Sequence, residues 1–121
     1  MQGYDPYAHA EALGLRIVYR PIEGASGLWI PEHRTIVLQP GLHRAHERST
    51  LAHEIVHAEF QDHGRVPAQE RRADRIAAQR LLAGFDLRRA AALSDDPGVW
   101  ALEAGVTDHL MEVHLRARAS A

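Results

Sequence analysis

Residues 50–60, TLAHEIVHAEF, constrain the fold of this chain more than any other stretch. On an α-helix, residues four apart differ by about 40° in direction, so His53 and His57 project from the same face. Apolar side chains cover most of the remaining surface, which predicts that this helix is buried. Two buried imidazoles and the carboxylate of Glu54 would each need a polar partner, and one metal ion would satisfy all three.

The spacing of the two histidines suits a zinc ion. A catalytic zinc site supplies three protein ligands and leaves one position open. A carboxylate beside the first histidine can then act as general base toward the water that attacks a peptide carbonyl, and Glu54 occupies that position. The alternative is a pair of core histidines that hydrogen-bond to neighbouring backbone groups or carboxylates.

Three side chains compete for the place of the third ligand. His63 stands at the spacing of the third histidine of metzincins, but Phe60 replaces the glycine that lets their chain turn back. His46 precedes His53 by about 10.5 Å of helix rise, which is too far to share one ion. Glu70, on the next predicted helix, is the candidate that we favour.

Glu70 and Asp74 lie on the apolar side of a helix predicted over residues 67–82. A regular helix places them in one stripe about 120° wide with three apolar residues, Ala73, Ala77 and Leu81. The opposite side carries the arginines Arg71, Arg72 and Arg75. Acidic groups in an apolar stripe need a positive partner, which a zinc ion held by two neutral histidines would provide.

We therefore expect Glu70 to be the third ligand. Asp74, one turn later, is expected to accept the free ring N–H of a ligating histidine and so to fix its tautomer. The alternative for this carboxylate pair is an ordinary surface pairing with arginines of the same helix, within residues 71–75 or at Arg80.

The rest of the chain predicts an α+β fold, in which a small antiparallel sheet of about three strands packs on a helical, zincin-like bundle. A short helix over residues 5–13 comes first. The predicted strands are residues 15–19, 28–30 and 34–39, with a turn at Pro31-Glu32-His33. The predicted helices are residues 42–62, residues 67–82, one capped by Asp86, one from Asp96-Pro97 to Gly105, and one capped by Thr107.

Length and composition set the class of protein. A chain of 121 residues, 45% hydrophobic and 25% charged, is expected to form one soluble domain over residues 1–121. A formal net charge of -2 provides no basic field, so no direct nucleic-acid partner is expected. The sequence has neither a bilayer-spanning apolar run nor a signal peptide, which predicts a cytoplasmic protein without membrane contact. With no cysteine, a metal site must use histidines and carboxylates.

The two motifs together resemble the ImmA/IrrE family of small intracellular metallopeptidases. TLAHEIVHAEF is similar to the LAHExxH of that family, and ERRADRIAAQRLL is similar to its E-x-x-A-[DN]-x-x-A-x-x-L-L. The combination also resembles the gluzincin arrangement. The resemblance implies that His53, His57 and Glu70 bind Zn²⁺, that Glu54 is the general base, and that Asp74 orients a histidine.

The resemblance also implies a biological role. Members of this family on phages and mobile elements cleave or inactivate a DNA-binding repressor, and others regulate a stress-response repressor. The implied function is a zinc-dependent endopeptidase with narrow specificity for such a protein. The alternative is a non-catalytic, zinc-stabilised module that inactivates a repressor by binding. One departure from the family is Ala83-Gly84, which replaces the frequent Met-Pro after the two leucines.

Substrate-binding residues are less clearly indicated. Zinc peptidases commonly hold an extended substrate along a strand edge, which residues 28–30 or 34–39 could supply. Trp29 would then line the cleft, although an aromatic residue on a strand is more often part of the core. The candidates for stabilising the oxyanion are Tyr19, His109 and His114.

The C-terminal helices have a second interpretation. Two helices separated by Gly-Val-Thr, within residues 100–118, are also typical of a helix-turn-helix. A recognition helix would begin with basic residues, whereas this one begins with Asp108 and carries Glu112. We therefore interpret the segment as a packing element or a surface that docks the repressor.

Overall fold

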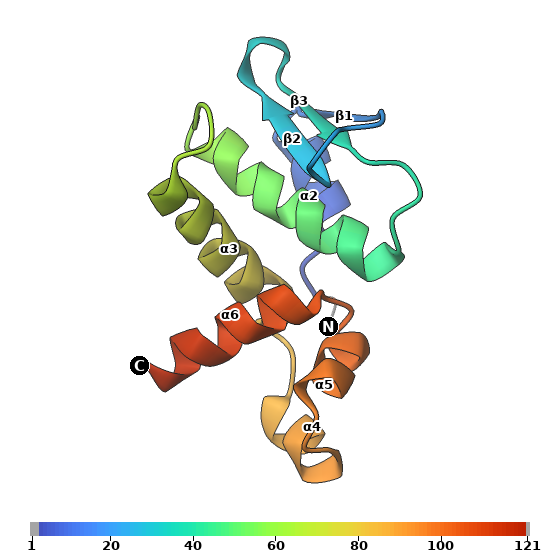
Figure 1. The fold of residues 1–121 in the computed structure, drawn as a ribbon, viewed down its shortest axis with the longest axis vertical. Coiled ribbons are helices and arrows are strands. Elements are labelled where there is room, and N and C mark those ends of the chain that lie inside the picture. The colour runs from blue at the N-terminus through green and yellow to red at the C-terminus, as the bar shows by residue number, and fades with distance from the viewer. Residues whose placement is uncertain (1–2, 121) are drawn as a thin grey trace.

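The computed structural model describes residues 3–120 and forms a sheet of three short strands at one end of the molecule, with helices making up the rest (Figure 1). The strands are β1 (Arg16–Tyr19), β2 (Gly27–Ile30) and β3 (Thr35–Leu38), and a single 3-10 turn, η1 (Pro31–His33), joins the last two. The helices are α1 (Pro6–Ala12), α2 (Arg44–Glu59), α3 (Pro67–Leu82), α4 (Leu87–Leu93), α5 (Pro97–Ala104) and α6 (Asp108–Ala119). The predicted α+β class and the predicted three strands are confirmed.

The sheet is mixed rather than wholly antiparallel, which corrects our prediction. Its order is β1-β3-β2: β2 pairs with β3 antiparallel, and β1 pairs with β3 in parallel. All four residues of β3 are buried, whereas β1 and β2 each have exposed positions. The most buried strand therefore takes the centre, and β2 becomes an edge of the sheet.

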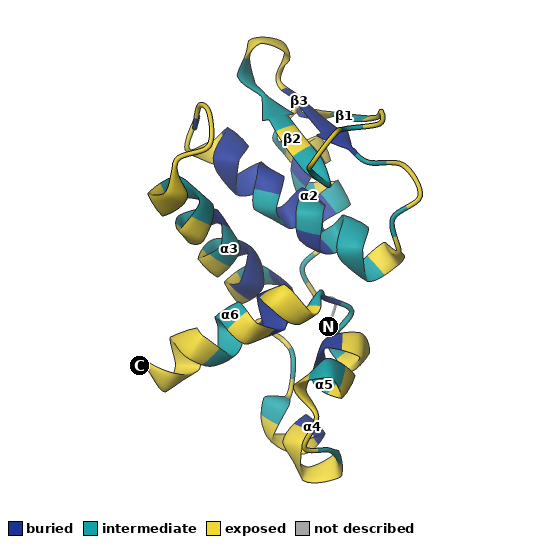
Figure 2. Cartoon of the chain, in the orientation of Figure 1, coloured by how far each residue is buried: buried dark blue, intermediate teal, exposed yellow. Residues whose placement is uncertain are grey.

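Helix α2 separates two hydrophobic clusters, which explains why most of residues 51–58 are buried (Figure 2). One cluster joins α2 to the sheet and α1, through Ala10, Leu15, Ile36, Leu38, Leu51, Ile55 and Ala58. The other joins α2 to α3, α5 and α6, through Ala52, Ala77, Ala78, Leu81, Leu82, Ala101, Val106, Leu110 and Met111. The helix that carries the two histidines is thus held from both sides.

Capping residues set the beginnings of the C-terminal helices as predicted. The side chain of Asp86 accepts a hydrogen bond from the backbone N–H of Arg89, and Thr107 accepts one from Leu110. Asp96 accepts one from Gly98 at the start of α5. These caps begin α4, α5 and α6 where the sequence predicted them.

Helix α2 ends at Glu59, three residues before the predicted limit at residue 62. Gln61 adopts a left-handed conformation, with φ of 54°, and the backbone N–H of Asp62 then bonds to the carbonyl of His57 at 2.9 Å. The chain therefore turns back toward the end of the helix instead of continuing along its axis. This early end brings Asp62 close to the second histidine of the motif.

Candidate metal centre

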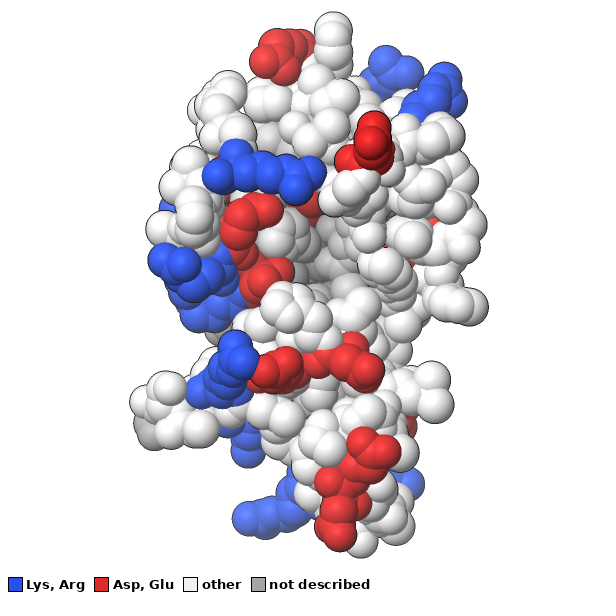
Figure 3. Space-filling model, in the orientation of Figure 1, with Lys and Arg blue, Asp and Glu red and all other residues white. Residues whose placement is uncertain are grey.

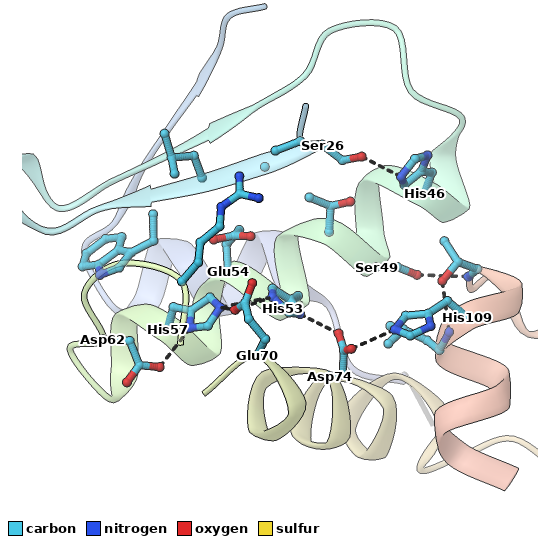
Figure 4. A pocket seen from close by; sticks show the side chains of 18 of the residues that line it. Ser26, His46, Ser49, His53, Glu54, His57, Asp62, Glu70, Asp74 and His109 are labelled. Carbon is cyan, nitrogen blue, oxygen red and sulfur yellow. Dashed lines mark hydrogen bonds and ion pairs between the residues drawn. The ribbon is translucent and has the colours of Figure 1, made fainter. Parts of the chain in front are cut away.

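The side chains of His53 and His57 project together from α2 into a cleft (Figure 4). Their Nε2 atoms lie 3.1 Å apart. The rings are largely buried, with 17% of the His53 side chain and 8% of the His57 side chain exposed. The helical spacing therefore brings the two imidazoles to one point, as the sequence predicted.

Glu70, in the first turn of α3, completes the group. Its Oε2 atom lies 3.4 Å from Nε2 of His53 and also contacts Nε2 of His57. Within residues 3–120, these three side chains form the group whose ligand atoms lie within 4.8 Å of one another and could hold a metal ion. Among residues 3–120, Glu70 and Asp74 pair with histidines and not with arginines, whereas Arg72 pairs with Asp62 and Arg80 with Glu59.

The other two candidates for the third ligand lie elsewhere. His63 is exposed and does not line the cleft. His46 lines the cleft, but its Nε2 lies 2.9 Å from the hydroxyl of Ser26 and it does not belong to the ligand group. Phe60, in place of the metzincin glycine, is 49% exposed.

Each histidine has its own carboxylate partner on the Nδ1 side of the ring. Nδ1 of His53 lies 2.7 Å from Asp74, the residue for which the sequence predicted a histidine contact, and Nδ1 of His57 lies 2.9 Å from Asp62, which we did not consider. An ionised carboxylate only accepts hydrogen bonds, so the neutral rings carry the hydrogen on Nδ1 and a lone pair on Nε2. The two Nε2 atoms and a carboxylate oxygen of Glu70 thus converge at one point. This set of ligand atoms fits a cation such as zinc.

Both of these carboxylates also bond to a second group. Oδ2 of Asp74 bonds to Nε2 of His109, on α6, at 2.7 Å, and Oδ1 of Asp62 accepts a 2.6 Å hydrogen bond from Arg72. Our prediction that Arg72 points away from the site is wrong, because its guanidinium reaches across to the end of α2. The reason is the early end of that helix, which places a buried carboxylate within reach.

The pKa shifts follow from this arrangement. Burial lowers the pKa of His53, but the hydrogen bond from its ring to Asp74 and the negative charges of nearby carboxylates outweigh burial and raise the pKa overall. Burial raises the pKa of Asp74, but its hydrogen bonds to His53 and His109 outweigh burial and lower it. The site thus favours positive charge between its carboxylates.

Glu54 lies beside the ligand group but is not part of it. It lines the cleft and is only 8% exposed, and among residues 3–120 no donor hydrogen-bonds to its carboxylate. Burial raises the pKa of Glu54, against the opposing effect of the two histidines. An ionised form without a hydrogen-bond partner is a stronger proton acceptor than a solvated carboxylate.

The cleft has a volume of about 590 Å³ and lies between β2 and the start of α6. Figure 3 shows it as a hollow near the middle of this face, with acidic side chains gathered along one side. Residues 24–29 line one wall, and residues 107–110 line the other. Of the two strands that we considered, only β2 is an edge, because β3 is central.

The other predicted cleft residues divide between the site and the rest of the molecule. Trp29 lines the cleft and also packs against the sheet-side core, so both interpretations apply to it. Among the oxyanion candidates, His109 lines the cleft, whereas Tyr19 bonds to Glu47 and His114 lies in a separate hollow between α3 and α6. The first turn of α6, which a helix-turn-helix would present to DNA, faces this cleft instead.

Gly27 allows β2 to lie close to α2 beside Glu54. A Cβ atom added at Gly27 would stand 2.5 Å from Cγ2 of Thr50 and 3.1 Å from Cγ of Glu54. We expect Gly27→Ala to lower the free energy of unfolding by about 1–3 kcal/mol, the usual cost of overpacking, in a urea titration. Gly84→Ala is the matched control, since its added Cβ meets no atom within 4 Å. Equal stability of the two variants would contradict this close packing.

Two histidines and one glutamate form the ligand set of a class of zinc peptidases. Consistent with that class, residues 10–114 match the family model of the IrrE N-terminal-like domain, Peptidase_M78. The match spans most of the chain, so the protein belongs to this metallopeptidase family, and the resemblance found in its motifs is confirmed. A peptidase family implies a protein substrate.

No curated protein matches the chain. Within residues 3–120, no helix is long and apolar enough to cross a bilayer.

Proposed function

We propose that this protein is a zinc-dependent endopeptidase that acts on one or a few protein partners. The observation that carries the proposal is the convergence of His53, His57 and Glu70 beside a buried Glu54, in an open cleft. Membership of the Peptidase_M78 family supports the same chemistry.

The ligand set favours zinc over magnesium and calcium. Zinc accepts imidazole nitrogen together with carboxylate oxygen, whereas magnesium and calcium prefer oxygen ligands alone. A bound zinc ion would polarise the scissile carbonyl and lower the pKa of a water molecule. With three ligands in the described part of the chain, a fourth position is left for water or substrate, which favours an enzyme over a closed structural site.

Glu54 would be the general base. Its place next to His53 on α2 puts the carboxylate inside the cleft, and its burial favours proton uptake. It would take a proton from the attacking water and then deliver it to the leaving amine. Asp74 would hold His53 in the tautomer that leaves Nε2 free, and His109 would hold Asp74.

The edge of β2 would align the substrate. The side of β2 that does not pair with β3 faces outward beside the cleft, and residues 24–29 line its wall. An extended peptide could add to this edge through backbone hydrogen bonds, which position the scissile bond with little demand on sequence. Specificity would then come from the docking of a whole protein, as expected for an enzyme with narrow specificity.

We propose that the partner is a DNA-binding repressor of a phage, a mobile element or a stress response, and that the enzyme acts in the cytoplasm. The motifs that resemble the ImmA/IrrE family support this substrate. A chain without cysteine is compatible with the reducing compartment. The net charge of -2 supports an action on the repressor rather than on its DNA.

Substrate trapping tests the proposal. Tagged Glu54→Gln protein, loaded with zinc and purified from cells of the source organism, is expected to retain its partner because it binds without cutting. The captured proteins are then incubated with the zinc-loaded wild type, and new chain ends are identified by mass spectrometry. A cut DNA-binding protein, left intact when a chelator is added, would support the proposal. Tight capture without cleavage would favour the non-catalytic module.

A further inference from the structure

We infer that Asp62 and Arg72 form a positioning pair that holds His57 in its metal-binding orientation. This inference deepens the proposed function, since it concerns the same metal site. It assigns a role to two residues that the family patterns do not specify, and it also gives a role to the aromatic residue at position 60. The pair is defined by hydrogen bonds on both oxygens of one buried carboxylate.

Asp62 is bound to His57 twice. Its backbone N–H donates to the carbonyl of His57 at 2.9 Å, and its Oδ2 accepts from Nδ1 of the same residue at 2.9 Å. Only 6% of Asp62 is exposed. The left-handed Gln61 is what makes both contacts possible, because it reverses the chain immediately after α2.

Arg72 stabilises the buried carboxylate of Asp62. Its guanidinium donates to Oδ1 of Asp62 at 2.6 Å and lies 3.9 Å above the ring of Phe60. A buried carboxylate without a positive partner is costly, and a cation stacked on an aromatic ring is held in place. Phe60 therefore supports the arginine, and the arginine supports Asp62.

The consequence for His57 is a fixed ring orientation and a fixed tautomer. Because the ionised Asp62 can only accept, the ring donates from Nδ1 and keeps its lone pair on Nε2, which faces Glu70 and His53. A carboxylate partner also makes the imidazole a stronger ligand. Asp74 does the same for His53, so each histidine of the motif has its own carboxylate.

Zinc affinity tests the inference. The wild type, Asp62→Ala and Arg72→Gln are titrated with zinc against a chromophoric chelator. We expect both variants to bind zinc about 10- to 100-fold more weakly, the usual cost of losing an outer hydrogen-bond partner of a metal ligand. The matched controls are Glu59→Gln and Arg80→Gln, which break another arginine–carboxylate pair, bonded at 2.6 Å, whose residues neither belong to the ligand group nor line the cleft. The controls are expected to bind zinc as the wild type does.

A second readout separates positioning from general loss of structure. In the zinc-loaded wild type, the Nδ1 proton of His57 should exchange slowly and resonate far downfield in the ¹H NMR spectrum. Asp62→Ala should lose this signal and leave the corresponding signal of His53 in place. Wild-type affinity in both variants, or an equal loss in the controls, would overturn the inference without affecting the proposed function. Failure of the wild type itself to bind zinc would overturn both.

Discussion

Glu54→Gln is expected to abolish cleavage of the protein substrate while zinc binding is retained. Glutamine has nearly the same shape as glutamate but cannot take a proton at neutral pH. General base catalysis contributes about 100- to 10,000-fold to rate, so kcat should fall by that factor. The cost to zinc affinity should be small, because Glu54 lies outside the ligand group.

The measurement is single-turnover cleavage of the trapped partner, with zinc content determined for each variant. Glu59→Gln is the matched control, because it makes the same change on the same helix at a residue that pairs with Arg80 instead of facing the cleft. The control should cleave at the wild-type rate. Cleavage by Glu54→Gln within a few-fold of the wild type would remove Glu54 from the mechanism.

Glu70→Ala should have the largest effect on zinc affinity among single changes outside the two histidines. It removes the only carboxylate of the ligand group, leaving two histidine ligands. We expect the affinity to fall more than 100-fold, beyond the roughly 10- to 100-fold expected for an outer partner such as Asp62 or Asp74. Competition with a chromophoric chelator measures the change.

His63→Ala is the counterpart of this experiment, since His63 was the rival candidate by spacing. Its exposed position outside the cleft predicts wild-type affinity. If His63→Ala weakened zinc binding and Glu70→Ala did not, the third ligand would be wrongly assigned.

Local signals in the sequence predicted the helices and strands well, but they did not predict how all the strands pair. Asp86, Asp96 and Thr107 each cap a helix that begins where a capping residue predicts. The order of the sheet depends on which strand is most deeply buried against α2, and short segments with similar β-propensity do not reveal this. We expected a wholly antiparallel sheet, and the parallel pairing of β1 with β3 was missed.

In the metal site, too, the relations within one helix were predicted, and the contact between Asp62 and Arg72 was not. Helix periodicity alone predicts that His53 and His57 share a face, and that Glu70 and Asp74 face inward, because these are relations within one helix. Asp62 and Arg72 meet only because Gln61 reverses the chain, and a left-handed glutamine has no clear sequence signal. The available hint was an aspartate five residues after the second histidine, which we passed over.

The central claim is that His53, His57 and Glu70 together hold one zinc ion and leave it open to water. Crystals grown with zinc, with anomalous scattering recorded above and below the zinc absorption edge, test this most directly. We predict one strong anomalous peak within bonding distance of Nε2 of both histidines and of the Glu70 carboxylate, with no fourth protein ligand. The absence of a peak at this point, or a peak closed off by a fourth side chain, would contradict the account.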